Sequence, residues 1–226
     1  MKLSQKIISF NISLLFAVLL SIFFIDRSLS NFIAENLSGF VPFFDNLTNY
    51  LDSITSYILY KLFGSLPYFL LLCFVFGLFC LLSRKTKLLA YFFLTMVFAY
   101  PLTSILTNIM KMESKRARPE VYLQGNEETK DFQSEQMPND SFPSGHAALY
   151  LSLFLPAGLA FRKYAPYFLI IPGIIILGRV VLNHHYLSDV LFSIVFVFDF
   201  CLFVYWLLNC LDRALTNIIN KLKSST

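Results

Sequence analysis

The sequence has little charge. Of its 226 residues, 14% are Asp, Glu, Lys or Arg, whereas 57% are hydrophobic and 17% are aromatic. An ordinary soluble domain carries about 25% charged residues, so this chain is too apolar for that class. The sequence also contains no internal repeat and no low-complexity segment, so we expect one domain over residues 1–226.

Cysteine is scarce, and its four positions follow no metal-binding spacing. All four fall inside apolar runs, at Cys73, Cys80, Cys201 and Cys210. We therefore expect them to be packing residues, and we predict a protein without a bound metal or other cofactor.

Long apolar runs dominate what is present. A membrane-spanning helix needs about 20 mostly apolar residues, and six such runs occur, at residues 7–25, 66–83, 88–110, 145–161, 165–183 and 188–210. The sequence therefore predicts an all-α membrane protein with six transmembrane helices. The first run is not followed by a small-residue cleavage site, so we expect it to be retained as an anchor.

The first run is expected to end at Asp26-Arg27, and the stretch from there to Gly64 is amphipathic. Apolar residues recur in it at helical spacing with polar residues between them. Pro42 is expected to divide the stretch into two helices. We expect these helices to lie along the outer interface of the membrane, beside a path for lipid; simple packing against the bundle is the alternative.

The distribution of basic residues predicts the orientation, because cytoplasmic loops are enriched in Lys and Arg. If the N-terminus is cytoplasmic, the inner segments carry ten basic residues and one acidic residue, Asp212. The basic ones are Lys2, Lys6, Arg84, Lys85, Lys87, Arg162, Lys163, Arg213, Lys221 and Lys223. We therefore expect both termini in the cytoplasm.

Three segments carry residues suited to chemistry, and this topology brings all three to the outer face. The first contains Lys111 and Arg118-Pro119, and the second is Pro143-Ser144-Gly145-His146. The third runs from Arg179 through His185 to Asp189. A polar, acidic loop from Pro119 to Phe142 joins the first two, and long loops in compact proteins are often functional.

In the third segment, a helix beginning near His185 would place Asp189 one turn away. Its carboxylate can then reach one ring nitrogen, which fixes the tautomer and leaves the other nitrogen free. Arg179 offers a planar fork of donors that suits a phosphate. The alternative is a capped loop between two membrane helices, because short motifs often match by chance.

Together the segments suit phosphoryl transfer. Lys111, Arg118 and Arg179 can neutralise charge on the phosphoryl oxygens, a task that metal ions perform elsewhere. Ser144 and Gly145, at a helix start, can form a cradle of amide hydrogens for an anion. His146 is then placed to protonate the leaving oxygen.

These motifs resemble the three-part signature of the type 2 phosphatidic acid phosphatase (PAP2) superfamily, whose membrane branch has a similar six-span arrangement. Its soluble relatives include the vanadium haloperoxidases. The resemblance implies that His185 is a nucleophile that forms a phosphohistidine, Asp189 its orienting partner and His146 the general acid. It also implies that Lys111, Arg118, Ser144, Gly145 and Arg179 hold the phosphate without a required metal.

Four residues are not explained by this signature. Gly178 stands where the family often has Ser. Lys115 and Arg116 lie outside the signature, and we expect them to form a solvated charged face; contact with a lipid head group is the alternative. Asp199 falls inside the last apolar run, where we expect a hydrogen-bonded structural carboxyl group.

The resemblance implies a lipid phosphatase of the cytoplasmic (inner) membrane with an extracytoplasmic active site. Candidate substrates are undecaprenyl diphosphate, phosphatidylglycerol phosphate, phosphatidic acid and lipid A phosphates. A phosphotransferase that uses the same histidine is one alternative, and a non-enzymatic lipid-binding protein is another. The expected partners are the substrate and the bilayer, with no nucleic acid; the sequence leaves the oligomeric state open.

Overall fold

The computed structural model describes residues 3–62, 64–124 and 130–224. Lys2 and residues 125–129 of the polar loop, both used above, lie outside them. Within the described ranges all regular secondary structure is helical, so the prediction of an all-α protein is confirmed.

The first helical stretch is longer than expected. It consists of α1 (Leu3–Leu20), a π-helical turn η1 (Ser21–Ile25) and α2 (Asp26–Asn36). The apolar run ends at Asp26-Arg27 as expected, but the helix does not, because it continues through Asp26 to Asn36. Asp26 is only 1% exposed, and it forms a buried ion pair with Arg116. The charge is thus neutralised inside the protein and does not mark a solvated loop.

The predicted division at Pro42 is confirmed. A short 3-10 turn, η2 (Ser38–Phe40), separates α2 from α3 (Val41–Ser56), and Pro42 occupies the first turn of α3. Proline is favoured there, because the first amides of a helix have no partner within it. The helix α3 then packs along α8 (Ala165–Val181) and ends in a π-helical turn, η3 (Tyr57–Leu62).

The remaining helices form a bundle around α7. They are α4 (Leu66–Leu81), α5 (Lys87–Ser114), α7 (Gly145–Ala160), α8 with a preceding turn η4 (Arg162–Tyr164), and α9 (Leu187–Ser224). The helix α7 packs against α5, α8 and α9. Small residues in this core, such as Ala99, Ala148 and Cys201, let the helices approach closely. Cys73 and Cys80 are also buried, whereas Cys210 is exposed, so the packing role is confirmed for three cysteines.

Four helical stretches are long and apolar enough to cross a membrane. They are Ile7–Asn36, Lys87–Leu123, Arg162–Val181 and Leu187–Ile218. The helices Leu66–Leu81 and Gly145–Ala160 are apolar but shorter. The composition and these helices identify a membrane protein.

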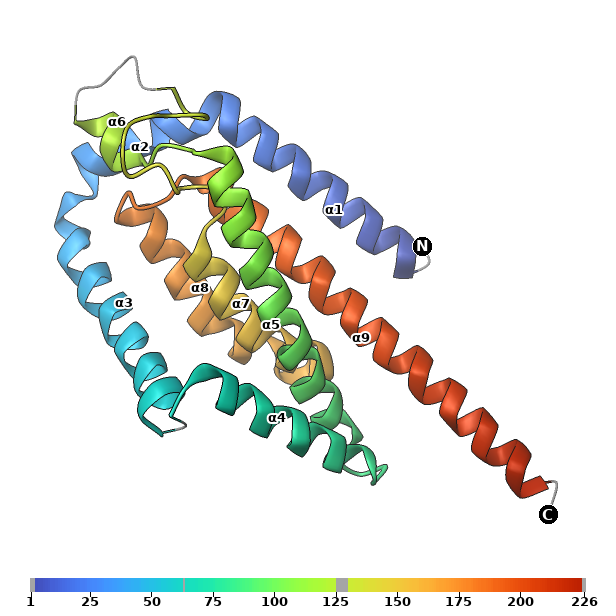
Figure 1. Cartoon of the computed structure of the whole chain (residues 1–226). Helices are drawn as coiled ribbons and strands as arrows, with labels where there is room; N and C mark the ends of the chain where they lie inside the picture. The colour runs from blue at the N-terminus through green and yellow to red at the C-terminus, as the bar shows by residue number, and fades with distance from the viewer. Residues whose placement is uncertain (1–2, 63, 125–129, 225–226) are drawn as a thin grey trace.

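The three segments with chemistry-bearing residues meet at one end of the bundle (Figure 1). The end of α5, the start of α7 and the connection from α8 to α9 lie there, together with α2 and the short helix α6 (Pro119–Leu123). Both chain ends lie away from this end (Figure 1). The fold therefore brings residues more than 70 positions apart into one site.

Candidate active site

His185 lies in the connection between α8 and α9 and is 4% exposed. Its amide donates to the carbonyl oxygen of Arg179 at 3.1 Å, and its Nδ1 lies 2.7 Å from the carbonyl oxygen of Ser141. A carbonyl only accepts hydrogen bonds, so Nδ1 carries the proton. The lone pair is therefore on Nε2, the nitrogen that is left to react.

Asp189, in the first turn of α9, is completely buried. Its Oδ2 accepts from the Ser141 hydroxyl at 2.5 Å and from the Tyr186 amide at 2.8 Å. The same oxygen lies 3.7 Å from Nδ1 of His185. At this distance the carboxylate can stabilise a positive charge on the ring. The short hydrogen bond that fixes the tautomer is the one to the Ser141 carbonyl. From the sequence, Asp189 was expected to fix the tautomer instead.

The expectation that Arg116 belongs to a solvated charged face was wrong. Its side chain is 0% exposed, so it is not part of a solvated face; Lys115, beside it, is exposed. Arg116 donates from Nη1 to Asp189 Oδ1 at 2.5 Å and from Nη2 to Asp26 Oδ2 at 2.7 Å. The physical reason is pairing: two buried carboxylates need a cation, and the fork of arginine reaches both.

Three further contacts hold the Arg116 guanidinium. Its central carbon lies 4.3 Å from the ring centroid of Tyr186 and 4.8 Å from that of Phe132, within range for cation–π attraction. Nη1 also donates to the Ser188 hydroxyl at 2.6 Å. No local pattern distinguishes Arg116 from Lys115 in the sequence, so sequence analysis missed this network.

Lys111 and Arg118 are brought together by Asp140 of the long loop. Arg118 donates to the Asp140 carboxylate from Nε at 2.8 Å and from Nη2 at 3.1 Å. Lys111 Nζ lies 3.3 Å from the same carboxylate and also donates to the Asp140 carbonyl. Partial burial opposes ionisation of Asp140, but the two cations outweigh it and hold the pKa of that carboxyl below its ordinary value.

Arg179 and His146 meet at a second carboxylate that sequence analysis did not single out, Asp52 of α3. Arg179 Nη2 donates to Asp52 Oδ2 at 2.8 Å, and Nε2 of His146 lies 3.4 Å from the same oxygen. The Tyr150 hydroxyl donates to the other oxygen at 2.8 Å. Burial opposes ionisation of Asp52, but these donors and the charge of Arg179 lower its pKa. In the sequence, the one signal for Asp52 is its position beside the apolar face of an amphipathic helix.

The cations surround the two histidines of the α8–α9 connection. Burial lowers the pKa of His185, and the positive charges of Lys111 and Arg118 add to this effect against the opposing influence of Asp189. Burial and the charges of Arg179 and Arg118 likewise lower the pKa of His184. His184 points to Arg179, with Nδ1 3.2 Å from Nη1. Both rings are therefore favoured in the neutral form.

Ser144 and Gly145 begin α7. The Ser144 hydroxyl accepts from the Ala147 amide at 3.4 Å, and the Ser144 amide donates to the Asp189 carbonyl at 3.4 Å. These Ser144 groups therefore cap α7 and tie it to α9. A β-carbon on Gly145 would lie 3.6 Å from Cε of Lys111, so this glycine sits directly beside the lysine chain. The first amides of a helix point outward without a helical partner, which suits an anion.

The glycine at position 178 has a steric explanation. A β-carbon at this position would lie 2.5 Å from Cγ2 of Thr48 on α3, and Thr48 is 0% exposed. Any side chain, including the Ser that the family often has, would push α3 away. Glycine at position 178 thus allows the approach of α3 that brings Asp52 to Arg179.

Asp199 has a partner far along the chain. Asn11 Nδ2 on α1 donates to Asp199 Oδ1 on α9 at 2.6 Å. The prediction of a hydrogen-bonded carboxyl group is confirmed, and its structural effect is to join the first and last helices.

The fold and the site define a membrane protein whose apolar helical bundle gathers histidine and basic side chains at one end. In agreement, a sequence model of the PAP2 superfamily matches residues 88–211, more than half of the chain. The chain belongs to the PAP2 superfamily, which implies phosphatase activity. Comparison with individual curated proteins and with solved structures found no match.

The region that matches the family model does not include the whole site. It contains α5 to α8 and most of α9, and with them every site residue expected from the sequence. Asp26 and Asp52 lie before it. The helices α1 to α3 therefore add two carboxylates to the site from outside the region that matches the family.

Proposed function

We propose that this protein hydrolyses a phosphomonoester or diphosphate of a membrane lipid through a phosphohistidine intermediate. The observation that carries the proposal is the state of His185. Its Nδ1 proton is committed to the Ser141 carbonyl, so Nε2 holds a lone pair, and the ring is buried close to Lys111 and Arg118. A neutral imidazole beside cations is suited to attack an anionic phosphoryl group.

In the first step, Nε2 of His185 attacks the terminal phosphorus, and the bond from this phosphorus to the bridging oxygen of the substrate breaks. His146 gives its proton to that oxygen, so a monoester releases its lipid alcohol and a diphosphate releases the lipid monophosphate. Water then attacks the phosphohistidine and loses a proton to His146, which releases phosphate and restores the starting state. Lys111, Arg118 and Arg179 compensate the phosphoryl charge without a required metal, and the amide of Gly145 adds a donor.

We further propose six transmembrane helices, with the active site on the outer side of the cytoplasmic membrane and both termini in the cytoplasm. The two shorter apolar helices, α4 and α7, would be the additional spans. With 16 residues each, they are about 24 Å long, which is somewhat short of the hydrocarbon thickness of about 30 Å. Support comes from the position of α7 in the centre of the bundle and from the basic inner segments.

The proposal is tested by trapping the phosphoenzyme. Purified protein in detergent is mixed with a ³²P-labelled lipid phosphate, quenched in alkali and separated by electrophoresis. We expect label on the wild type that is lost in acid, as a phosphohistidine requires. His185→Ala should abolish both label and turnover.

His184→Ala is the matched control, because it removes the neighbouring imidazole. The His184 ring bonds to Arg179 and has no hydrogen bond to Ser141 or Asp189 among the described residues, so this variant should keep the label with a moderate loss of rate. Label that persists in His185→Ala and disappears in His184→Ala would overturn the assignment of the nucleophile.

A further inference from the structure

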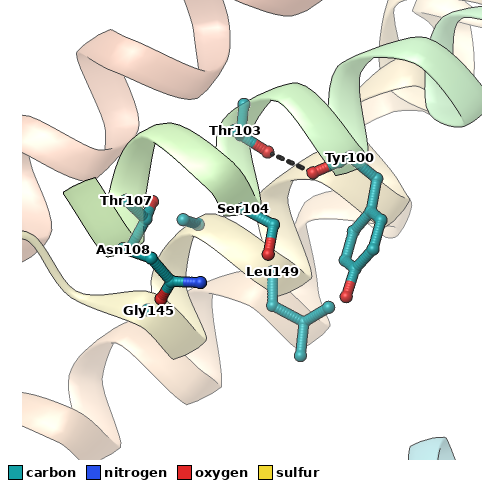
Figure 2. Close-up of a pocket in the computed structure, with 8 residues that line it drawn as sticks. Tyr100, Thr103, Ser104, Thr107, Asn108, Gly145 and Leu149 are labelled. Carbon is teal, nitrogen blue, oxygen red and sulfur yellow. Dashed lines mark hydrogen bonds between the residues drawn. The ribbon is translucent and has the colours of Figure 1, made fainter.

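A pocket of about 190 Å³ lies between α5 and α7, beside the proposed phosphate site (Figure 2). Gly145 belongs to its wall, and a β-carbon on this residue would lie 3.6 Å from the Lys111 side chain. The pocket therefore adjoins the lysine that is proposed to bind phosphate. Its α5 wall carries five side chains with hydroxyl or amide groups: Tyr100, Thr103, Ser104, Thr107 and Asn108.

The polar residues follow one face of α5. Tyr100, Ser104 and Asn108 are four residues apart, and Lys111 continues the same face one turn later. Figure 2 shows these three side chains projecting from α5 on the side of Leu149 and Gly145. From Tyr100 to Lys111 the helix rises about 16 Å. The polar face thus runs from the phosphate site into a stretch that is long and apolar enough to span a membrane.

Several of these polar groups lack a protein partner. The Thr107 hydroxyl lies on a residue that is 3% exposed, and it has no hydrogen-bond partner among the described residues. Within that part of the chain, the side chains of Ser104, which is half-buried, and Asn108, which is exposed, are not hydrogen-bonded either. Thr103 differs, since its hydroxyl donates to the Tyr100 carbonyl at 3.0 Å. Polar groups in apolar surroundings cost free energy unless they are bonded, so this face suits a ligand that supplies oxygen atoms.

We propose that the pocket binds the acyl ester or amide oxygens that lie close to the phosphate of the substrate. This inference rests on the proposed function and narrows its substrate class. Diacylglycerol phosphates and acylated amino-sugar phosphates share such oxygens, which accept hydrogen bonds from Ser104, Thr107 and Asn108. A polyprenyl phosphate has only hydrocarbon there and leaves the same donors unpaired, which strongly disfavours a substrate.

The test compares substrates within each variant. Values of kcat/KM are measured in detergent for a dioleoyl glycerol phosphate, an acylated glucosamine phosphate and a polyprenyl phosphate. The wild type should prefer the acylated substrates over the polyprenyl phosphate. In Thr107→Val/Asn108→Leu, the ratio of acylated to polyprenyl kcat/KM should fall about tenfold, the effect of losing one to two hydrogen bonds. The acylated substrate with the larger fall is the natural class.

The matched control is Thr95→Val. Thr95 is also a buried threonine of α5 without a hydrogen-bond partner among the described residues, but it does not line the pocket. Its substitution should leave the ratio within about twofold of the wild type. A ratio that is unchanged in the double variant, or a wild type that prefers the polyprenyl phosphate, would overturn the inference and leave the phosphatase proposal standing. Failure of the wild type to hydrolyse any of the three lipids would instead refute the phosphatase proposal itself.

Discussion

The role of Arg116 is open to a quantitative test. Its guanidinium pairs with Asp26 and Asp189, and all three side chains are 0% exposed. Replacement of Arg116 by Met removes the cation and leaves two carboxylates buried without compensation. Breaking a buried ion pair from one side costs about 3–5 kcal/mol. We therefore expect Arg116→Met to lower the free energy of unfolding by at least that amount, measured by SDS titration in mixed micelles.

Two variants separate this effect from general damage. Lys115→Met removes the same charge one residue earlier, from an exposed side chain, and should change stability by less than about 0.5 kcal/mol. Arg116→Met/Asp26→Asn leaves one unpaired carboxylate where Arg116→Met leaves two, so it should recover part of the lost stability. Its turnover should remain low, because Asp189 still lacks the cation that holds it beside His185. If Arg116→Met unfolds within about 0.5 kcal/mol of the wild type, the network does not stabilise the fold as described.

Two more predictions concern α3 and the nucleophile. Gly178→Ser should destabilise the protein by about 1–3 kcal/mol through overpacking, since its β-carbon would lie 2.5 Å from Thr48. In the same SDS titration, the double variant Gly178→Ser/Thr48→Ala should recover most of the lost stability. If Gly178→Ser lowers the stability equally with Thr or Ala at position 48, the steric explanation is contradicted. Burial and nearby cations hold the pKa of His185 below its ordinary 6.5, so its reactive neutral form should persist as the pH falls to 6.5 and be lost only as the pH falls through that lower pKa. The rate of phosphoenzyme formation between pH 4 and 9 checks this: a loss of rate on acidification with its midpoint above pH 6.5 would refute it, whereas a loss of rate on alkalinisation reports deprotonation of the general acid His146.

The helices and the reactive segments were predictable because their signals are local. Apolar runs mark the bundle helices. Asp189 lies 3.7 Å from the His185 ring, close to it as expected, although the helix begins at Leu187 and not near His185. The tautomer of the ring is less local: its Nδ1 bonds to the carbonyl of Ser141, 44 positions earlier. A backbone carbonyl has no signature in a sequence, so this partner could not be predicted.

The sequence by itself determined the all-α class, the three segments and the identity of the residues proposed for catalysis, because periodicity and motif spacing depend on neighbours along the chain. Only the tertiary structure decided which charges pair. Arg116 meets Asp26 across 90 positions, and Arg179 meets Asp52 across 127. A charge in a sequence looks the same whether it will face water or a buried partner, and the difference arises only when distant helices exclude water from between them.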